Sequence, residues 1–326
     1  MRRRSRRTPL LLALALACQA MLPLARPAAA RAELINVELR FSPYQDAPAE
    51  GLARPSVEGR ALVSLNGIPV MHEVITERTL LLDRDSREPT PLVWIPMGQN
   101  DPLLRRRDNL LRLTFIPRNA GQPYATWLSW NGVSDREQRS ESILADGTVR
   151  VTTGNLVDLQ VTERRLSGEL VYERRFDAPW VKEESWQALP AITGLSAADE
   201  AALRRLVRQR RDLYGSDLRE AYAVIPARAG VDVAVLRQNR CLELARDGGM
   251  VFGDADGSGV RLRTTGGPVV VAEGSSGDLF PRQFPEGFGR RHDAGQDLCL
   301  LGALAAAFPR WLLFVRNGDG SWRTLN

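Results

Sequence analysis

The sequence predicts a β-rich N-terminal antiparallel sandwich followed by a smaller α+β domain. Short runs of alternating apolar and polar residues, separated by turn residues, fill the first half of the chain after its N-terminal segment. Apolar residues recur at helical spacing only beyond the segment 179–195, and the helices and strands there do not alternate regularly. A chain of 326 residues is long enough for two domains of ordinary size.

Residues 1–30 are predicted to be a signal peptide. Arginines between Arg2 and Arg7 form a basic start, Leu10–Leu24 is mostly apolar, and small residues end the segment at Ala30. The apolar run is too short and too interrupted for a comfortable membrane span, so we expect no stable transmembrane span in the mature protein. Cleavage near Ala30 would leave a periplasmic or secreted protein.

Three alternatives for the N-terminus stay open. Leu14–Cys18 is similar to a lipoprotein cleavage box, which would put a lipid on Cys18. Arg6 and Arg7 lie in a segment that resembles a twin-arginine export motif, with Pro9 at the position that usually holds an aromatic residue. The segment could also remain as an N-terminal anchor helix.

The charge of the mature chain argues against nucleic-acid binding. The whole chain carries a net charge of +5, but residues 1–30 hold six arginines and no acidic residue. Without them 38 basic residues face 39 acidic ones, a net charge of −1. Affinity for nucleic acid needs a net basic face on the mature protein. We interpret the arginines of residues 204–211 as one solvated face of a helix.

Residues 33–178 are predicted to form the sandwich. Asn66-Gly67 lies between two strand-like runs and is a strong hairpin signal, because both residues tolerate positive φ. Leu111, Leu113 and Phe115 alternate with polar neighbours, so they should face a common core. The strands are expected at 34–41, 60–65, 68–75, 80–82, 92–95, 109–115, 124–130, 157–162 and 169–176. We expect the first of them to end before Pro43.

Aromatic residues mark the candidate binding surface of the sandwich. Trp127 and Trp130 are an odd number of positions apart on one strand, so they should face opposite sides of the sheet. Tyr124 shares the side of Trp130. Tyr124, Trp127 and Trp130 are therefore the candidate ligand-stacking residues, although a linker aromatic such as Trp180 or Trp186 could cover the exposed ring.

Residues 179–195 are predicted to be a linker, and residues 196–326 the α+β domain. The tryptophans of the linker indicate that it packs against a domain. Ser196 and Asp293 are predicted helix N-caps, and a further helix is expected over 232–247. The helix that follows Asp293 is apolar all round, so we expect it to be buried. Strands are expected at 250–252, 260–263, 268–272, 311–316 and 321–324, the last two as a hairpin.

Cys241 and Cys299 are predicted to form a disulfide. They are the two cysteines left after export into an oxidising compartment, where pairs are expected to bridge. Cys299 shares a helix face with small residues such as Gly302 and Ala306, which allows another backbone to come close. The alternative is two free buried thiols.

The sequence offers no convincing catalytic, metal or cofactor site. His72 and His292 are the only histidines, and neither accompanies a nucleophile elbow or a zinc-ligand spacing. Asp254–Gly259 resembles the start of a calcium loop, but Thr265 replaces the bidentate glutamate, and a β-hairpin turn is the better interpretation. No glycine spacing fits a nucleotide loop. We therefore expect neither a cofactor nor a metal.

Three functions remain as hypotheses. The first is a non-catalytic exported protein that binds a protein partner or a cell-envelope component through sandwich loops or an interdomain groove. The second is a carboxylate-dependent envelope glycan hydrolase, which would require paired acidic residues in a cleft. The third is a carbohydrate-binding module that uses Trp127 or Trp130.

Overall fold

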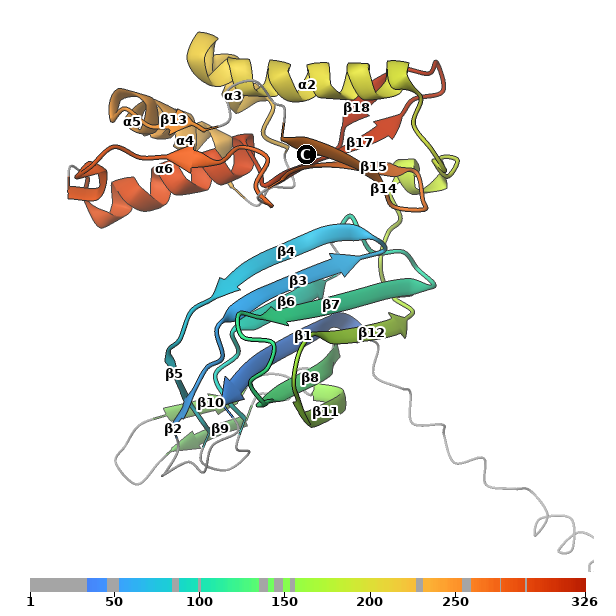
Figure 1. Cartoon of the computed structure of the whole chain (residues 1–326), viewed down its shortest axis with the longest axis vertical. Coiled ribbons are helices and arrows are strands. Elements are labelled where there is room, and N and C mark those ends of the chain that lie inside the picture. The colour runs from blue at the N-terminus through green and yellow to red at the C-terminus, as the bar shows by residue number, and fades with distance from the viewer. Residues whose placement is uncertain are drawn as a thin grey trace, which may run out of the picture.

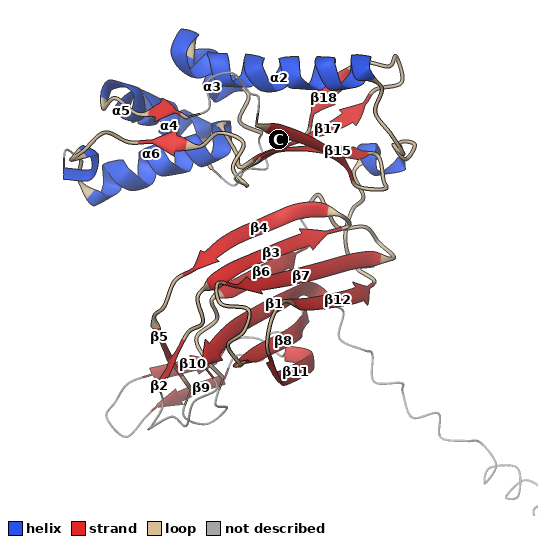
Figure 2. Ribbon diagram, viewed as in Figure 1, coloured by secondary structure: helices blue, strands red, loops and turns tan. Residues whose placement is uncertain are grey.

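A computed structural model gives the architecture of the chain (Figures 1 and 2). It is strand-rich, with antiparallel sheets in the N-terminal part and most helices in the C-terminal part, as the sequence predicts. The structure describes residues 34–45, 53–83, 88–98, 101–134, 140–143, 149–152, 156–226, 231–253, 259–275, 277–290 and 292–326. The segment predicted to be a signal peptide, with Cys18, lies outside these residues.

The N-terminal part is a sandwich of two antiparallel four-stranded sheets. The first sheet has the order β11-β8-β1-β6, with strands β1 (Leu34–Gln45), β6 (Val93–Gly98), β8 (Tyr124–Ser134) and β11 (Leu156–Leu166). The second has the order β12-β7-β3-β4, with strands β3 (Gly59–Leu65), β4 (Ile68–Ile75), β7 (Asn109–Pro117) and β12 (Leu170–Phe176). Two short pairs flank them: β2 (Ala53–Pro55) with β5 (Thr79–Leu81), and β9 (Ser140–Ile143) with β10 (Val149–Thr152).

Alternating side chains build the core of the sandwich. Leu111, Leu113 and Phe115 of β7 are fully buried and pack against Leu39 and Phe41 of the other sheet. The Asn66-Gly67 turn joins β3 to β4 with φ angles of 54° and 77°, as the hairpin signal predicts. Inward-facing residues of both sheets therefore form one apolar layer.

The expected end of the first strand before Pro43 is wrong. β1 continues to Gln45 and pairs with β8 along this stretch, where Pro43 lies opposite Thr126. β6 pairs with β1 only as far as Phe41. Beyond Phe41 this side of β1 meets residues 56 and 57 instead: Tyr44 bridges Ser56, and the carbonyl of Pro43 accepts a hydrogen bond from the N–H of Val57. Pro43 is tolerated there because it takes part in this contact as an acceptor, so its missing N–H is not needed.

The C-terminal part is an antiparallel sheet with helices on one face. The sheet has the order β14-β15-β17-β18, with strands β14 (Val260–Thr264), β15 (Val269–Gly274), β17 (Trp311–Arg316) and β18 (Trp322–Thr324). The helices are α2 (Ala197–Ser216), α3 (Leu218–Ala223), α4 (Val233–Gln238), α5 (Cys241–Asp247) and α6 (Ala294–Ala307). The pair β13 (Val251–Phe252) and β16 (Arg282–Gln283), and the 3-10 turn η3 (Phe288–Arg290), complete it.

Both predicted helix caps are confirmed. Ser196 accepts a hydrogen bond from the backbone N–H of Asp199 at the start of α2, and Asp293 accepts one from Gln296 at the start of α6. In each case the side chain three residues on returns a bond to the cap, which closes a capping box.

Three expectations for this part are wrong. The helix expected over 232–247 is split into α4 and α5, because Arg240 between them is left-handed, with φ of 51°. Helix α6 is not buried all round: Leu298 is 75% exposed. The strands beside Asp254–Gly259 do not form a hairpin with each other, since β13 pairs with β16 and β14 pairs with β15; residues 254–258 themselves lie outside the described residues.

The predicted disulfide is confirmed. Cys241 at the start of α5 and Cys299 within α6 are bonded, with their Cα atoms 5.3 Å apart. The bond joins α5 to α6. Both helices pack into one hydrophobic core, which includes Ala303 and Leu304 of α6. It closes a loop with a sequence separation of 58 residues. None of the described helices has the length and apolar character of a membrane span.

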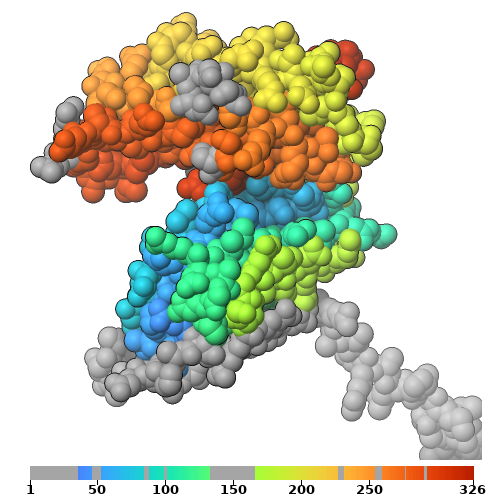
Figure 3. Space-filling model, viewed as in Figure 1, coloured from blue at the N-terminus to red at the C-terminus, as the bar shows by residue number. Residues whose placement is uncertain are grey.

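The sandwich and the C-terminal part are in contact (Figure 3), and an apolar layer lies between them. Val269, Val271, Leu313 and Val315 face away from the helices, and Ile68 from the β3–β4 hairpin packs on them. The 3-10 turn η1 (Ser185–Ala188) of the segment 179–195 adds Trp186, which is only 3% exposed. The expectation that the aromatics of this segment pack against a domain is confirmed.

Candidate functional site

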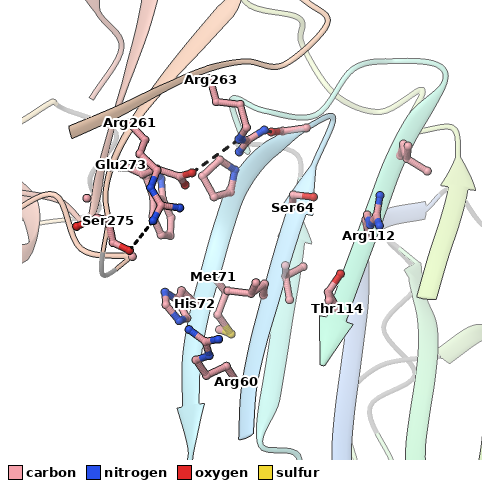
Figure 4. A pocket seen from close by; sticks show the side chains of 18 of the residues that line it. Arg60, Ser64, Met71, His72, Arg112, Thr114, Arg261, Arg263, Glu273 and Ser275 are labelled. Carbon is pink, nitrogen blue, oxygen red and sulfur yellow. Dashed lines mark hydrogen bonds and ion pairs between the residues drawn. The ribbon is translucent and has the colours of Figure 1, made fainter. Parts of the chain in front are cut away.

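The candidate site is a groove between the outer face of the second sandwich sheet and the hairpin of β14 and β15 (Figure 4). Its volume is about 540 Å³. Strands β3, β4, β7 and β12 supply one wall, and the segment 261–277 supplies the other. The groove therefore exists only because the two parts of the molecule are packed together.

Strand alternation places the side chains of the sandwich wall. In β3 the residues Ala61, Val63 and Leu65 enter the core, so Arg60, Leu62 and Ser64 face outward. The register then fixes their neighbours: Ser64 lies opposite Arg112 of β7, and Leu62 lies between Thr114 of β7 and His72 of β4. This face of the sheet forms the floor of the groove, and it carries apolar, hydroxyl and arginine side chains.

The opposite wall comes from the C-terminal sheet. Arg261 Nη2 donates to the carbonyl of Ser275 at 3.2 Å, and Arg263 Nη1 donates to the carbonyl of Gly67 at 3.0 Å. The second of these bonds crosses from one part of the molecule to the other. A side chain on Gly67 would also lie 2.9 Å from the carbonyl oxygen of Thr265, so only glycine allows this close approach of the hairpin.

Positive charge exceeds negative charge in the groove. Four arginines and two glutamates line it. Glu173 pairs with Arg112 at 3.5 Å, and Glu273 pairs with Arg263 at 3.9 Å. Arg60 and Arg261 have no ion pair within the part of the chain that the structure describes. The groove can therefore attract and hold a carboxylate or phosphate group.

Arg60 and His72 lie close together in the groove (Figure 4). Arg60 lies opposite Val74 and His72 lies opposite Leu62, so the two are diagonal neighbours on one face, within reach of each other's long side chains. Nε2 of His72 is buried and has no hydrogen-bond partner among the described residues. This nitrogen therefore lies beneath the surface of the groove, and the Arg60 guanidinium is the exposed polar group of the pair.

A tight contact fixes the imidazole of His72. A Cβ atom on Gly277 would lie 2.4 Å from Cε1 of His72, so the turn at Gly277 rests directly on the ring. Gly277 also has a φ of +88°, which side chains rarely adopt. The carbonyl of His72 accepts a hydrogen bond from Arg310. The ring is thus held by both parts of the molecule.

The groove contains two glutamates and one histidine. Its two glutamates come from opposite walls, and each is engaged by its own arginine. Nε2 of His72 meets no described hydroxyl, so it forms no nucleophile–base pair at that nitrogen. Within the described ranges no three His, Cys, Asp or Glu side chains gather as a set of metal ligands.

The predicted stacking residues lie elsewhere. Tyr124 and Trp130 are 0% and 3% exposed in the sandwich core, so neither presents a ring face to solvent. Trp127 faces the opposite side, as the strand period predicts, and is half-buried against Tyr44 and Leu80. Trp186 packs on the C-terminal sheet and Trp180 packs on the sandwich core, so among the described residues neither of these tryptophans belongs to the cluster around Trp127. The ligand-stacking role of these rings stays a prediction.

Sequence reasoning missed the residues that line the groove. The alternation of residues 60–65 could have put Arg60 and Ser64 on one outer face. It could not have shown that β14 lies across that face, since this contact joins residues almost 200 positions apart. Compared with protein-family models, with curated proteins and with solved structures, the chain matches none.

Proposed function

We propose that the protein is a non-catalytic binding protein of the exported compartment. Its ligand is a negatively charged cell-envelope component, bound through carboxylate or phosphate groups. The observation that carries the proposal is the groove with Arg60 and Arg261, which form no ion pair with any residue that the structure describes. The Cys241–Cys299 bond supports export, because such bonds persist in oxidising compartments.

Hydrogen bonds and apolar contacts hold the two parts of the molecule together. This favours a binding function over a catalytic function that requires the two domains to close. Gln187 of the linker donates to the carbonyls of Pro102 and Leu104, at 3.2 and 2.8 Å, while its neighbour Trp186 packs on the C-terminal sheet. The backbone of Ile192 adds a bond to the carbonyl of Gly267. A groove that is already formed loses little conformational entropy when a ligand enters.

Two polyanions are used to test whether the groove binds carboxylate groups or phosphate groups. Purified protein lacking residues 1–30 is titrated with polygalacturonate, which carries carboxylates, and with polyphosphate, and neutral dextran serves as the blank. We expect binding of at least one polyanion that weakens with added salt, because exposed charges are screened. Arg60→Glu should reduce the affinity at least tenfold, on the order of 1.4 kcal/mol.

The matched control is Arg78→Glu, an equally exposed arginine that does not line the groove. It should leave the affinity within a factor of two. Equal losses for both variants would assign the binding to net charge alone, and no binding of either polyanion would overturn the proposal. Release of reducing ends from the glycan would instead support the hydrolase hypothesis.

A further inference from the structure

A second groove runs along the other side of β4. Its volume is about 700 Å³, and it shares Pro69, Met71 and Trp311 with the cationic groove. Its far wall is the small-residue face of α6, with Gly302 and Ala306. Whereas the first groove is lined by arginines, this one is lined mainly by apolar side chains.

The open edge of a sheet faces this groove. β6 is the last strand of the first sandwich sheet. Trp94 and Pro96 on its outer face and Ile95 and Met97 on its core face all line the groove. Successive residues of a strand point to opposite faces, so a groove that touches all four lies along the edge of the strand.

The backbone of this edge is free to pair. The N–H of Met97 donates to Oδ1 of Asn36 on β1, so the polar groups of Met97 point into the sheet. The groups of Trp94 and Pro96 then point the other way, where no strand of the described part of the chain follows. Pro96 has no N–H to donate, which suits an outward position. The N–H and C=O of Trp94 and the C=O of Pro96 remain for an extended chain.

The side chains beside this edge suit apolar residues. The indole of Trp94 is 53% exposed, and its Nε1 donates to Oε2 of Glu38 at 2.9 Å, which holds the ring in place. Met71 and Met97 lie nearby in the lining. Methionine side chains adapt to different apolar shapes, so the groove can receive more than one kind of apolar residue.

One carboxylate lies among these apolar residues. Asp101 follows β6 and lines the groove. Burial raises the pKa of this carboxyl, and a hydrogen bond from the N–H of Leu103 offsets part of the rise. Within the described residues no arginine, lysine or histidine forms an ion pair with Asp101. A buried carboxylate without a cation is complementary to a basic side chain of an occupant.

We propose that this second groove binds an extended segment of a protein partner, which adds to the sandwich as a strand along β6. The segment presents alternate apolar side chains to the outer face of β6, where Trp94 and Pro96 lie, and a lysine or arginine to Asp101. An extended polypeptide is the occupant that can satisfy the free backbone groups, the apolar lining and the lone carboxylate together. The proposal is independent of anion binding in the cationic groove.

The test uses a phage-displayed library of random 12-residue peptides, selected on the immobilised protein lacking residues 1–30. We expect enriched peptides with alternating apolar residues and one basic residue. A synthetic peptide of the enriched sequence is then titrated by fluorescence anisotropy. Trp94→Ala and Asp101→Asn should each weaken binding about tenfold, and N-methylation of the peptide at alternate residues should abolish it.

Matched controls are Leu81→Ala, an exposed apolar residue 65% open to solvent, and Asp212→Asn, an exposed aspartate on α2. Both should bind the peptide as the wild type does. The proposal is overturned if no peptide is enriched, if controls and groove variants behave alike, or if N-methylation has no effect. Self-association that Trp94→Ala removes would assign the groove to a second copy, and would also overturn it.

Discussion

Two strands, β7 in the sandwich and β15 in the C-terminal sheet, differ in how they are covered. β7 alternates: Leu111, Leu113 and Phe115 are fully buried, and Arg112 between them is exposed. In β15 four consecutive residues, Val269 to Ala272, are all 0–1% exposed. A strand that is buried on one face has a sequence in which apolar and polar residues alternate. A strand that is buried on both faces has a continuous apolar sequence.

The difference teaches that the two parts depend on each other unequally. The sandwich covers its own sheets with its own core. The C-terminal sheet has helices on one face, and the other face is covered by Ile68 of the sandwich and Trp186 of the linker. This part is further fastened by the disulfide and by buried Arg210, which donates to the carbonyls of Ala307 and Asn326. Burial lowers the pKa of Arg210 to about 10.

The disulfide should have the largest single effect, and only on the C-terminal part. The double variant Cys241→Ser, Cys299→Ser should lose roughly 4 kcal/mol of stability, because the enclosed loop is long. Urea unfolding, followed by far-UV circular dichroism, measures the loss. A thiol titration of the denatured wild type should give no free thiol from this pair before reductant. Two free thiols, or a loss below about 1 kcal/mol, would contradict the fastening role.

Removal of Trp186 tests the seam between the two parts. Trp186→Ala should cost about 3 kcal/mol, since it empties a buried site between the linker and the C-terminal sheet. The variant should also bind polyanions more weakly, because the groove needs both walls. Urea unfolding and the polygalacturonate titration check the two effects. A variant that keeps the stability and affinity of the wild type would show that the parts are held together by other contacts.

Asp199 provides a smaller, pH-dependent test inside the C-terminal part. Its carboxylate accepts hydrogen bonds from the side chain and backbone of Ser196, from Arg316 and from Nε1 of Trp322, so it joins α2 to β17 and β18. These bonds, that from the Ser196 side chain foremost, hold the pKa of Asp199 well below its usual range. Asp199→Ala should therefore cost about 2 kcal/mol at pH 7.

The sign of the pH effect follows from that lowered pKa. The stabilisation is complete above the ordinary aspartate pKa of about 3.9 and is lost as the pH falls toward the lower value in the folded protein. The difference between Asp199→Ala and the wild type should thus shrink when urea unfolding is repeated at pH 3. A difference that is constant from pH 7 to pH 3 would mean that the carboxylate charge does not matter.

Local signals predicted the parts of the fold that depend on near neighbours. Asn66-Gly67 marked a hairpin because its turn needs positive φ, and Ser196 and Asp293 marked helix starts because caps act within three residues. Cys241 and Cys299 were paired correctly because they are the two cysteines that remain after the predicted signal peptide is removed. The left-handed residue Arg240 was missed, since arginine carries no signal for that conformation.

The two grooves could not be predicted from the sequence, because they depend on contacts between residues that are far apart along the chain. The cationic groove needs Arg60 of the sandwich and Arg261 of the C-terminal sheet on facing walls. The sequence predicted that Trp127 or Trp130 carries an exposed ring. Among the described tryptophans, the ring that is largely exposed to solvent is that of Trp94. The strand expected at 92–95 contains Trp94, but only the structure shows that this ring faces outward and that β6 lies at the edge of its sheet.

The most direct test of anion binding between the two parts is a crystal structure of the protein with trigalacturonate. We predict the sugar acid in the cationic groove, with a carboxylate within hydrogen-bond distance of the Arg60 guanidinium. Trigalacturonate bound at another surface, with the cationic groove empty at saturating ligand, would contradict the account.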